Sequence, residues 1–202
     1  MLRVNQSRPP EIILASTSPY RSDLLIKLGV QFEQIDPSYI EKDRPDELPS
    51  EKASRHALGK ATSVSADIST NSPFIVIGSD QVVHLGKLVL SKPGNHDVAA
   101  AQLKACSGNW VTFTTAICLA NEAGQIFKAF ECFRIKYRDL SPSDIARYLE
   151  IDEPFDCAGS IKIEAAGIRL LEDTDGRDIN IVHGLPLILL QDSLRIFFNY
   201  IL

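Results

Sequence analysis

The chain has few cysteines and histidines, and neither residue type is arranged as a metal or redox site. No two of the four cysteines lie close together in the sequence, so it offers neither a zinc knuckle nor a CxxC redox motif. The four histidines form no HExxH motif and no pair at helical spacing, which leaves no case for a histidine zinc centre. Hard cations with oxygen ligands are the metals that this composition leaves open.

An excess of positive charge and a long apolar run are also missing. The formal net charge is -5, whereas domains that bind nucleic acid usually carry a basic stripe. Residues 185–202 are the most apolar segment, but polar residues interrupt them within the length of a membrane helix, and the apolar run 12–15 is too short for a signal sequence. We therefore expect a cytoplasmic protein that binds neither nucleic-acid polymers nor membranes.

Length and composition are typical of one α/β domain. The chain has 202 residues, of which 45% are apolar and 23% are charged. Residues 1–10 are mostly polar, and we interpret them as a flexible extension before a single domain over 11–202. Strand patterns and helix patterns mix along the chain without an internal repeat, which indicates an α/β fold.

The first third of the chain predicts a strand, a hydroxyl-rich turn and two helices. Residues 11–15 are a short apolar run, and Ser18 suits the N-cap of a helix that ends at Gly29. After an acidic, proline-rich loop, a second helix is predicted over 50–66 with Ser50 as its cap. The chain therefore passes from a strand through hydroxyl groups directly into a helix.

A second apolar run predicts the position of a functional carboxylate. Residues 74–78 are typical of a buried strand, which we expect to carry Asp80 at its carboxyl end, where ligand sites of α/β sheets gather. The remaining patterns predict antiparallel strands over 111–120 and 129–137, a helix over 141–150 capped by Ser141, an alternating strand over 161–164 and an apolar core helix within 185–202.

Several side chains could carry chemistry, and each also has an ordinary structural interpretation. The turn from Ser16 to Arg21 combines hydroxyls, helix-start N–H groups and a guanidinium, which suits an anion, but the same turn is a common helix cap. A carboxylate at the end of a buried strand is costly without a cation or donors, which favours Asp80 as a functional residue over a turn cap. Glu41 could be a second oxygen ligand or part of a solvated acidic loop.

The basic residues and the last acidic residue are ambiguous in the same way. Lys60 and Lys92 could neutralise phosphate or lie on the solvated surface. In the strand predicted over 161–164, Lys162 and Glu164 share a face. Glu164 could accept hydrogen bonds from a guanine edge, or it could form an exposed charge pair.

Six segments taken together resemble the Maf-like nucleoside triphosphate pyrophosphatases. They lie in the order of that family and cover nearly the whole chain: LASTSPYR at 14–21, RHALGKA at 55–61, IGSDQV at 77–82, SKP at 91–93, CAGSIKIE at 157–164 and NIVHGLP at 180–186. The resemblance implies an elongated mixed α/β fold, similar to inosine triphosphate pyrophosphatases, with two lobes around a deep cleft and often a homodimer. It implies hydrolysis of a nucleoside triphosphate to the monophosphate and pyrophosphate.

The resemblance also implies roles for individual residues. Asp80 is the implied proton acceptor, and Glu41 and Asp80 lie near a Mg²⁺ or Mn²⁺ ion. The groups implied to face the phosphates are Ser16, Arg21, Lys60 and Lys92. The positions that mark the branch acting on 7-methyl-GTP are Tyr20, Gln81 and Glu164.

The chain departs from that branch at three positions. Tyr20 stands where the branch usually has tryptophan, Ser22 where it often has a second arginine, and His183 where it has a small apolar residue. One alternative is a pyrophosphatase of the same family that acts on dTTP, UTP or another nucleoside triphosphate. A second, of another class, is a nucleotide-binding regulator of cell division that hydrolyses nothing. The rates at which the protein hydrolyses a panel of nucleotides distinguish these alternatives.

Overall fold

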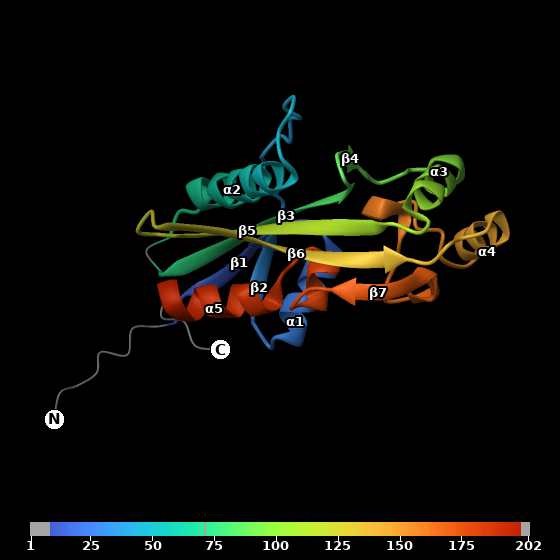
Figure 1. Ribbon diagram of the computed structural model, residues 1–202. Coiled ribbons are helices and arrows are strands. Elements are labelled where there is room, and N and C mark those ends of the chain that lie inside the picture. Colours follow the sequence, from blue (N-terminus) through green and yellow to red (C-terminus); the bar gives the residue numbers. More distant parts are fainter. Residues whose placement is uncertain (1–8, 71, 199–202) are drawn as a thin grey trace.

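A computed structural model describes residues 9–70 and 72–198, so most of the predicted N-terminal extension lies outside the described residues. In the described part a seven-stranded mixed sheet has the order β2-β1-β3-β5-β6-β7, with β4 paired to β3 (Figure 1). The strands are β1 Glu11–Ala15, β2 Phe32–Ile35, β3 Phe74–Leu85, β4 Leu88–Val89, β5 Trp110–Asn121, β6 Ile126–Tyr137 and β7 Leu171–Asp175. The predicted α/β fold is confirmed.

The helices divide the molecule into two lobes. In the larger lobe, α2 covers one face of the sheet, while α1 and α5 cover the other, and α3 and α4 lie at the far end of β5 and β6 in the smaller lobe (Figure 1). The α-helices are α1 Pro19–Lys27, α2 Pro49–Asp67, α3 His96–Cys106, α4 Pro142–Asp152 and α5 Leu187–Phe197. Short 3-10 helices span Ala158–Ser160, Ala166–Leu170 and Ile179–His183. No helix of the described segments is long and apolar enough to cross a membrane.

Strand β3 joins a parallel part of the sheet to an antiparallel part. Its first half pairs with β1 in parallel up to Ala15 opposite Gly78, whereas β5 pairs with it in the antiparallel direction along nearly its whole length. The prediction that Asp80 follows the end of its strand was therefore wrong, because pairing with β5 carries β3 on to Leu85. Asp80 instead lies just beyond the end of the neighbouring strand β1, at the carboxyl edge of the parallel part.

Most predicted helix boundaries are confirmed, and one helix cap is corrected. Gly29 has φ +71 directly after α1, and Ser141 caps α4 with a reciprocal bond to Asp144. Helix α2 begins at Pro49 rather than at a Ser50 cap, because Glu51 accepts a hydrogen bond from the backbone N–H of Leu48. The described part of the predicted C-terminal helix is α5, and residues 199–202 lie outside the described segments.

The strand predicted over 161–164 is wrong. The backbone N–H groups of Ala165 and Gly167 both donate to the carbonyl of Lys162, which folds the segment into a tight turn before a 3-10 helix. The alternating pattern has no partner strand here, so it cannot form a ladder. Lys162 instead donates to the carbonyl of Asp152 over 3.0 Å, and Glu164 is exposed.

A glycine in β3 allows α2 to lie directly on the sheet. A methyl group built at Gly78 would lie 2.3 Å from the carbonyl oxygen of Ala57 and 2.7 Å from the backbone nitrogen of Ala61. Both are backbone atoms, which cannot turn away as a flexible side chain could. The close approach at Gly78 therefore fixes the distance between α2 and β3.

We predict that Gly78→Ala destabilises the protein by about 3 kcal/mol, because the added methyl group overpacks a rigid contact. The measurement is the free energy of unfolding in urea. Gly86→Ala is the control, since a methyl group there meets no atom within 4 Å and bears only the cost of its left-handed backbone, about 1 kcal/mol. Equal losses in the two variants would contradict the packing argument.

Candidate active site

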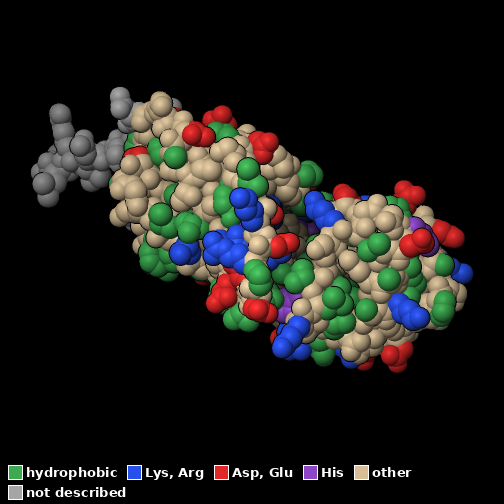
Figure 2. Space-filling view, turned by 90° about the horizontal axis from the view of Figure 1, so that it is seen from above, with side chains coloured by type: hydrophobic (Ala, Val, Ile, Leu, Met, Phe, Trp, Pro, Cys, Tyr) green, Lys and Arg blue, Asp and Glu red, His purple; other side chains and the backbone are tan. Residues whose placement is uncertain are grey.

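A cleft of about 640 Å³ lies between the two lobes, and Figure 2 shows the hollow with charged side chains around it. Its wall includes the start of α1, the loop before α2, the middle of β3 and the segments around 156–164 and 182–184. The predicted site residues that line it are Ser16, Tyr20, Arg21, Glu41, Lys60, Asp80, Gln81, Lys92 and Glu164. The cleft thus brings together every site residue predicted from the sequence, and the two-lobed shape is confirmed.

At one end of the cleft, two carboxylates contact the same ammonium group. The Nζ atom of Lys60 lies 2.7 Å from Oδ1 of Asp80 and 2.6 Å from Oε1 of Glu41. Asp80 is 8% exposed and is paired, which excludes the turn-cap interpretation. Lys60 is likewise no solvated surface lysine, because its side chain is 11% exposed. These contacts join α2, β3 and the loop before α2.

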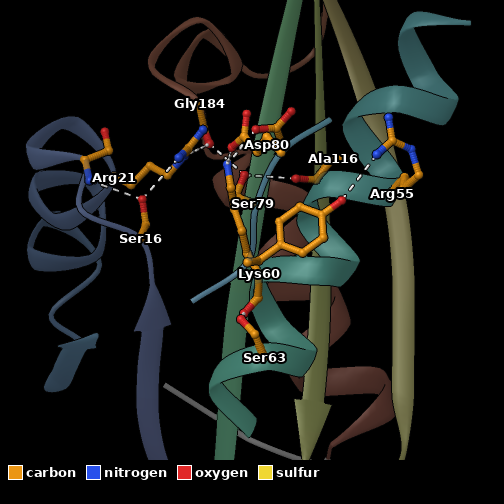
Figure 3. Close-up of polar contacts among 12 residues, drawn as sticks. Ser16, Arg21, Arg55, Lys60, Ser63, Ser79, Asp80, Ala116 and Gly184 are labelled. Atoms are coloured by element: carbon orange, nitrogen blue, oxygen red, sulfur yellow. Dashed lines mark hydrogen bonds and ion pairs between the residues drawn. The ribbon is translucent and has the colours of Figure 1, made fainter. Parts of the chain in front are cut away.

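A second cation lies opposite Lys60. Arg21 donates through Nε to the carbonyl of Gly184 over 2.9 Å and through Nη1 to Oγ of Ser16 over 3.1 Å (Figure 3). Burial lowers the pKa of Arg21, while the charges of Asp80 and Glu41 act in the opposite direction. A guanidinium stays protonated even so, and this partly buried charge can therefore stabilise an anion in the cleft.

The Ser16 hydroxyl and the start of α1 are arranged around that guanidinium. The Oγ atom of Ser16 accepts from Arg21 and also from the backbone N–H of Ser18 over 3.2 Å. Ser18 occupies the N-cap position as predicted, but its own side chain makes no capping bond. The hydrogen bond at this turn is therefore made by the Ser16 side chain, next to Arg21, and not by the side chain of the predicted cap Ser18.

The loop that carries Glu41 is clamped to the same helix as Lys60. Arg55 forms two hydrogen bonds with the carboxylate of Glu47, of 2.6 and 2.5 Å, and donates to the hydroxyl of Tyr39 over 3.2 Å. The Tyr39 ring lies against Gly59, where an added methyl group would lie 2.2 Å from a ring carbon. The sequence analysis missed Tyr39 and Gly59 as site-building residues, although the RHALGKA segment contained the glycine.

Partial burial acts to raise the pKa of Glu41, but the hydrogen bond and charge of Lys60, with His56 and Arg21, outweigh it and lower that pKa below its usual value. Glu41 is therefore ionised at neutral pH. Its contact with Lys60 also excludes the interpretation of Glu41 as merely a solvated loop residue.

Aromatic and acidic side chains occupy the other end of the cleft. The rings of Tyr20 and His183 are nearly parallel, with centroids 6.5 Å apart and an interplanar angle of 18°. The Tyr20 hydroxyl lies 3.6 Å from Sγ of Cys157, and the Nδ1 atom of His183 lies 3.6 Å from Oε2 of Glu164. The hydrogen bond with Cys157, followed by burial, raises the pKa of Tyr20, so the phenol is neutral.

Gln81 fixes the loop that carries His183. Its amide nitrogen donates to the carbonyl of Ile181 over 2.5 Å and to the hydroxyl of Thr115 over 3.0 Å. Thr115 donates to the same carbonyl over 3.0 Å. Gln81 therefore lines the cleft while its amide group holds the loop, and its predicted role in specificity stays a prediction.

Glu41 and Asp80 are the residues that could hold a divalent cation. The described segments contain no group of three or more histidine, cysteine or acidic side chains suited to a metal ion. Mg²⁺ is commonly bound by one or two carboxylates together with substrate phosphates and water. Glu41 and Asp80 both contact the Nζ atom of Lys60, and two neighbouring carboxylates match a site of this kind. They are too few for a metal centre built entirely from protein ligands.

The fold and the cleft define an α/β protein whose site combines clustered cations, paired carboxylates and an aromatic end. The family model for Maf-like proteins matches residues 11–197. The chain therefore belongs to the Maf-like family. This finding agrees with the six segments that carried the resemblance.

Relatives of known name match over almost their whole length. The 7-methyl-GTP pyrophosphatases of Alcanivorax borkumensis and Nitrosococcus oceani are each 43% identical to this chain, covering 92% and 93% of it and 93% of each relative. The 7-methyl-GTP pyrophosphatase of Hahella chejuensis is 42% identical over 95% of this chain and 96% of its own.

Solved structures give weaker matches. A nucleoside triphosphatase (dITP/XTP pyrophosphatase) from Mycobacterium abscessus has a TM-score of 0.44 at 16% identity, over 64% of this chain and 75% of its own. The Ham1 protein of Staphylococcus aureus has a TM-score of 0.45 at 14% identity, over 64% and 72% of the two chains.

A buried histidine beneath the site generates a prediction about pH. His56 is 1% exposed, one helical turn before Lys60, and its Nδ1 atom has no hydrogen-bond partner among the described residues. Burial lowers its pKa, more than the nearby carboxylates of Asp80 and Glu41 raise it. Below about pH 6.5 the unfolded chain takes up a proton at this position more readily than the folded chain.

We therefore expect the melting temperature to fall between pH 7 and pH 5, and to fall less in His56→Phe. The measurement is thermal unfolding followed by circular dichroism over that range. His96→Phe is the control, because the His96 side chain is 56% exposed, and it should keep the slope of the wild type. An identical slope in His56→Phe would exclude His56 as a source of the pH dependence.

Proposed function

We propose that this chain is a nucleoside triphosphate pyrophosphatase that hydrolyses 7-methyl-GTP to the monophosphate and pyrophosphate. The observation that carries the proposal is the convergence of Asp80, Lys60 and Glu41 in one cleft with a partly buried arginine. The names of the relatives, at up to 43% identity over most of the chain, support the substrate.

The basic side chains would neutralise the triphosphate. Arg21 and Lys60 are fixed on different elements, and Lys92 lines the same cleft from the segment after β4. Charges held in place before the reaction stabilise developing negative charge without reorganisation. A divalent cation, when bound, would polarise the phosphate oxygens and so add to this stabilisation. Glu41 and Asp80 would hold it.

Asp80 is the proposed general base. Lys60 contacts its Oδ1 atom, and none of the hydrogen bonds found in the described segments uses Oδ2. Oδ2 can therefore accept the proton of a water that attacks the α-phosphorus. Lys60 keeps the carboxylate oriented.

The base would lie at the aromatic end of the cleft. Methylation at the imidazole nitrogen makes guanine cationic, and a cation is attracted to the face of an aromatic ring such as Tyr20. Glu164 can accept hydrogen bonds from the edge of the base. The cation–π contact contributes about 0.5 to 2 kcal/mol, which limits the preference over GTP from this contact to roughly 30-fold.

Two other functions stay as alternatives, of which the second has little support in the sequence. A dTTP or UTP pyrophosphatase would use the same phosphate end with a different base. A regulator of cell division that binds nucleotide without hydrolysis would have no use for the paired Asp80 and Lys60. A cytoplasmic location and a homodimer, both expected from the sequence, stay predictions and are part of this proposal.

The first experiment is a panel of 7-methyl-GTP, GTP, dTTP, UTP and CTP with Mg²⁺ or Mn²⁺, measuring release of pyrophosphate and monophosphate. We expect the highest kcat/KM for 7-methyl-GTP. Asp80→Asn should lower kcat by about 10²- to 10⁴-fold, which corresponds to roughly 3–5 kcal/mol, because it removes the proton acceptor.

The matched control is Asp139→Asn, an exposed acid outside the cleft, which should keep wild-type turnover. Near-normal kcat in Asp80→Asn would overturn its assignment as the base. Faster turnover of dTTP or UTP would replace the substrate but keep the mechanism. Nucleotide binding without turnover of any substrate would favour the regulator.

The metal proposal has a separate test in Glu41→Gln. Loss of one of two carboxylates should raise the Mg²⁺ concentration for half-maximal rate by about tenfold or more, since oxygen ligand charge determines the affinity for hard cations. The measurement is a Mg²⁺ titration at saturating nucleotide. Asp46→Asn, an acid of the same loop that does not line the cleft, should titrate as the wild type does. Full activity in excess chelator would contradict metal dependence.

A further inference from the structure

Two aromatic rings at the base end keep part of their faces uncovered. The rings of Tyr20 and His183 are nearly parallel, and their centroids are 6.5 Å apart, near the upper end of the range of about 4.5–7 Å for aromatic pairs. The His183 side chain is 18% exposed and Tyr20 is half-buried, and both line the cleft. A flat ring that enters the cleft can therefore contact both aromatic side chains.

The backbone on both sides of His183 is anchored by hydrogen bonds. The carbonyl of Ile181 accepts hydrogen bonds from Gln81 and Thr115. The carbonyl of Gly184 accepts from Nε of Arg21 over 2.9 Å and from Oγ of Ser79 over 2.8 Å. Both anchors tie the backbone of the loop to groups next to the phosphate end, so His183 extends into the cleft from an anchored backbone.

The imidazole is also suited in charge to a cationic or neutral purine. Burial lowers the pKa of His183, Glu164 acts to raise it, and the charge of Lys27 lowers it further. The ring is therefore neutral near pH 7 and does not repel a cationic base. The arrangement does not resemble a metal site, because no cluster of three ligand side chains occurs in the described segments.

We propose that His183 is a specificity-determining residue, whose ring binds the purine base of the substrate together with Tyr20. Glu164, 3.6 Å from His183, then faces the edge of the same base. The inference rests on the proposed function, because it assigns a base to this end of the cleft. It predicts an effect on nucleotide affinity and none on the chemical step.

The test compares His183→Leu with His183→Phe. Both variants are apolar and both remove the contact with Glu164, so the main difference between them is the aromatic face, which only the Phe variant has at residue 183. We expect KM for 7-methyl-GTP to be about 3- to 10-fold higher in His183→Leu than in His183→Phe, with kcat within about twofold in both. The loss should appear in KM because the ring contacts the base and not the phosphates.

His96→Leu is the matched control for loss of a histidine that contacts an aromatic ring. Its centroid distance to Phe155 is also 6.5 Å, but it lies outside the cleft, and its KM should stay at the wild-type value. Equal KM values in His183→Leu and His183→Phe, or a fall in kcat at constant KM, would overturn the proposal. Melting temperatures confirm that both variants are folded.

Failure of the proposed function is detected separately from failure of this inference. If the wild type hydrolyses another nucleotide faster, the substrate assignment fails, and the Leu and Phe variants are compared with that nucleotide. If the wild type hydrolyses nothing, the dissociation constant of 7-methyl-GTP from calorimetry replaces KM. In each case, a ratio near one between the KM values, or the dissociation constants, of the two variants overturns the role of His183.

Discussion

The site depends on the close contact between α2 and β3 at Gly78. Lys60 reaches Asp80 only because the backbone of the helix around Ala57 and Ala61 lies against a residue without a side chain. Two residues further along β3, the carboxylate of Asp80 becomes buried and costly to hold without a partner. The same helix supplies that partner. The packing of α2 on β3 at Gly78 and the ion pair between Lys60 and Asp80 therefore depend on each other.

Much of this arrangement could be predicted from local patterns. The strand at 11–15, the apolar run before Asp80 and the helix ended by Gly29 each have a strong signal, because they follow from burial and from backbone conformation. The grouping of the site residues in one cleft could be predicted because the six segments together resemble a single family. Each of these residues alone also had an ordinary structural interpretation.

Other features follow from contacts between distant segments, which a linear pattern does not contain. The full length of β3 depends on pairing with β5 some forty residues away. The pattern at 161–164 alternates like a strand, yet no strand of the described residues pairs with it, and hydrogen bonds to the Lys162 carbonyl form a turn instead. The clamp of Arg55 on Glu47 and Tyr39 likewise needs the folded loop before it can be recognised.

The bond from Arg21 to the Gly184 carbonyl has a geometric consequence. His183 is the residue directly before Gly184, and consecutive Cα atoms are about 3.8 Å apart across a trans peptide. The residue that carries the aromatic ring and the carbonyl that accepts from the Arg21 guanidinium are thus neighbours along the backbone. A change in the backbone at this peptide would therefore affect the aromatic side chain and the arginine together.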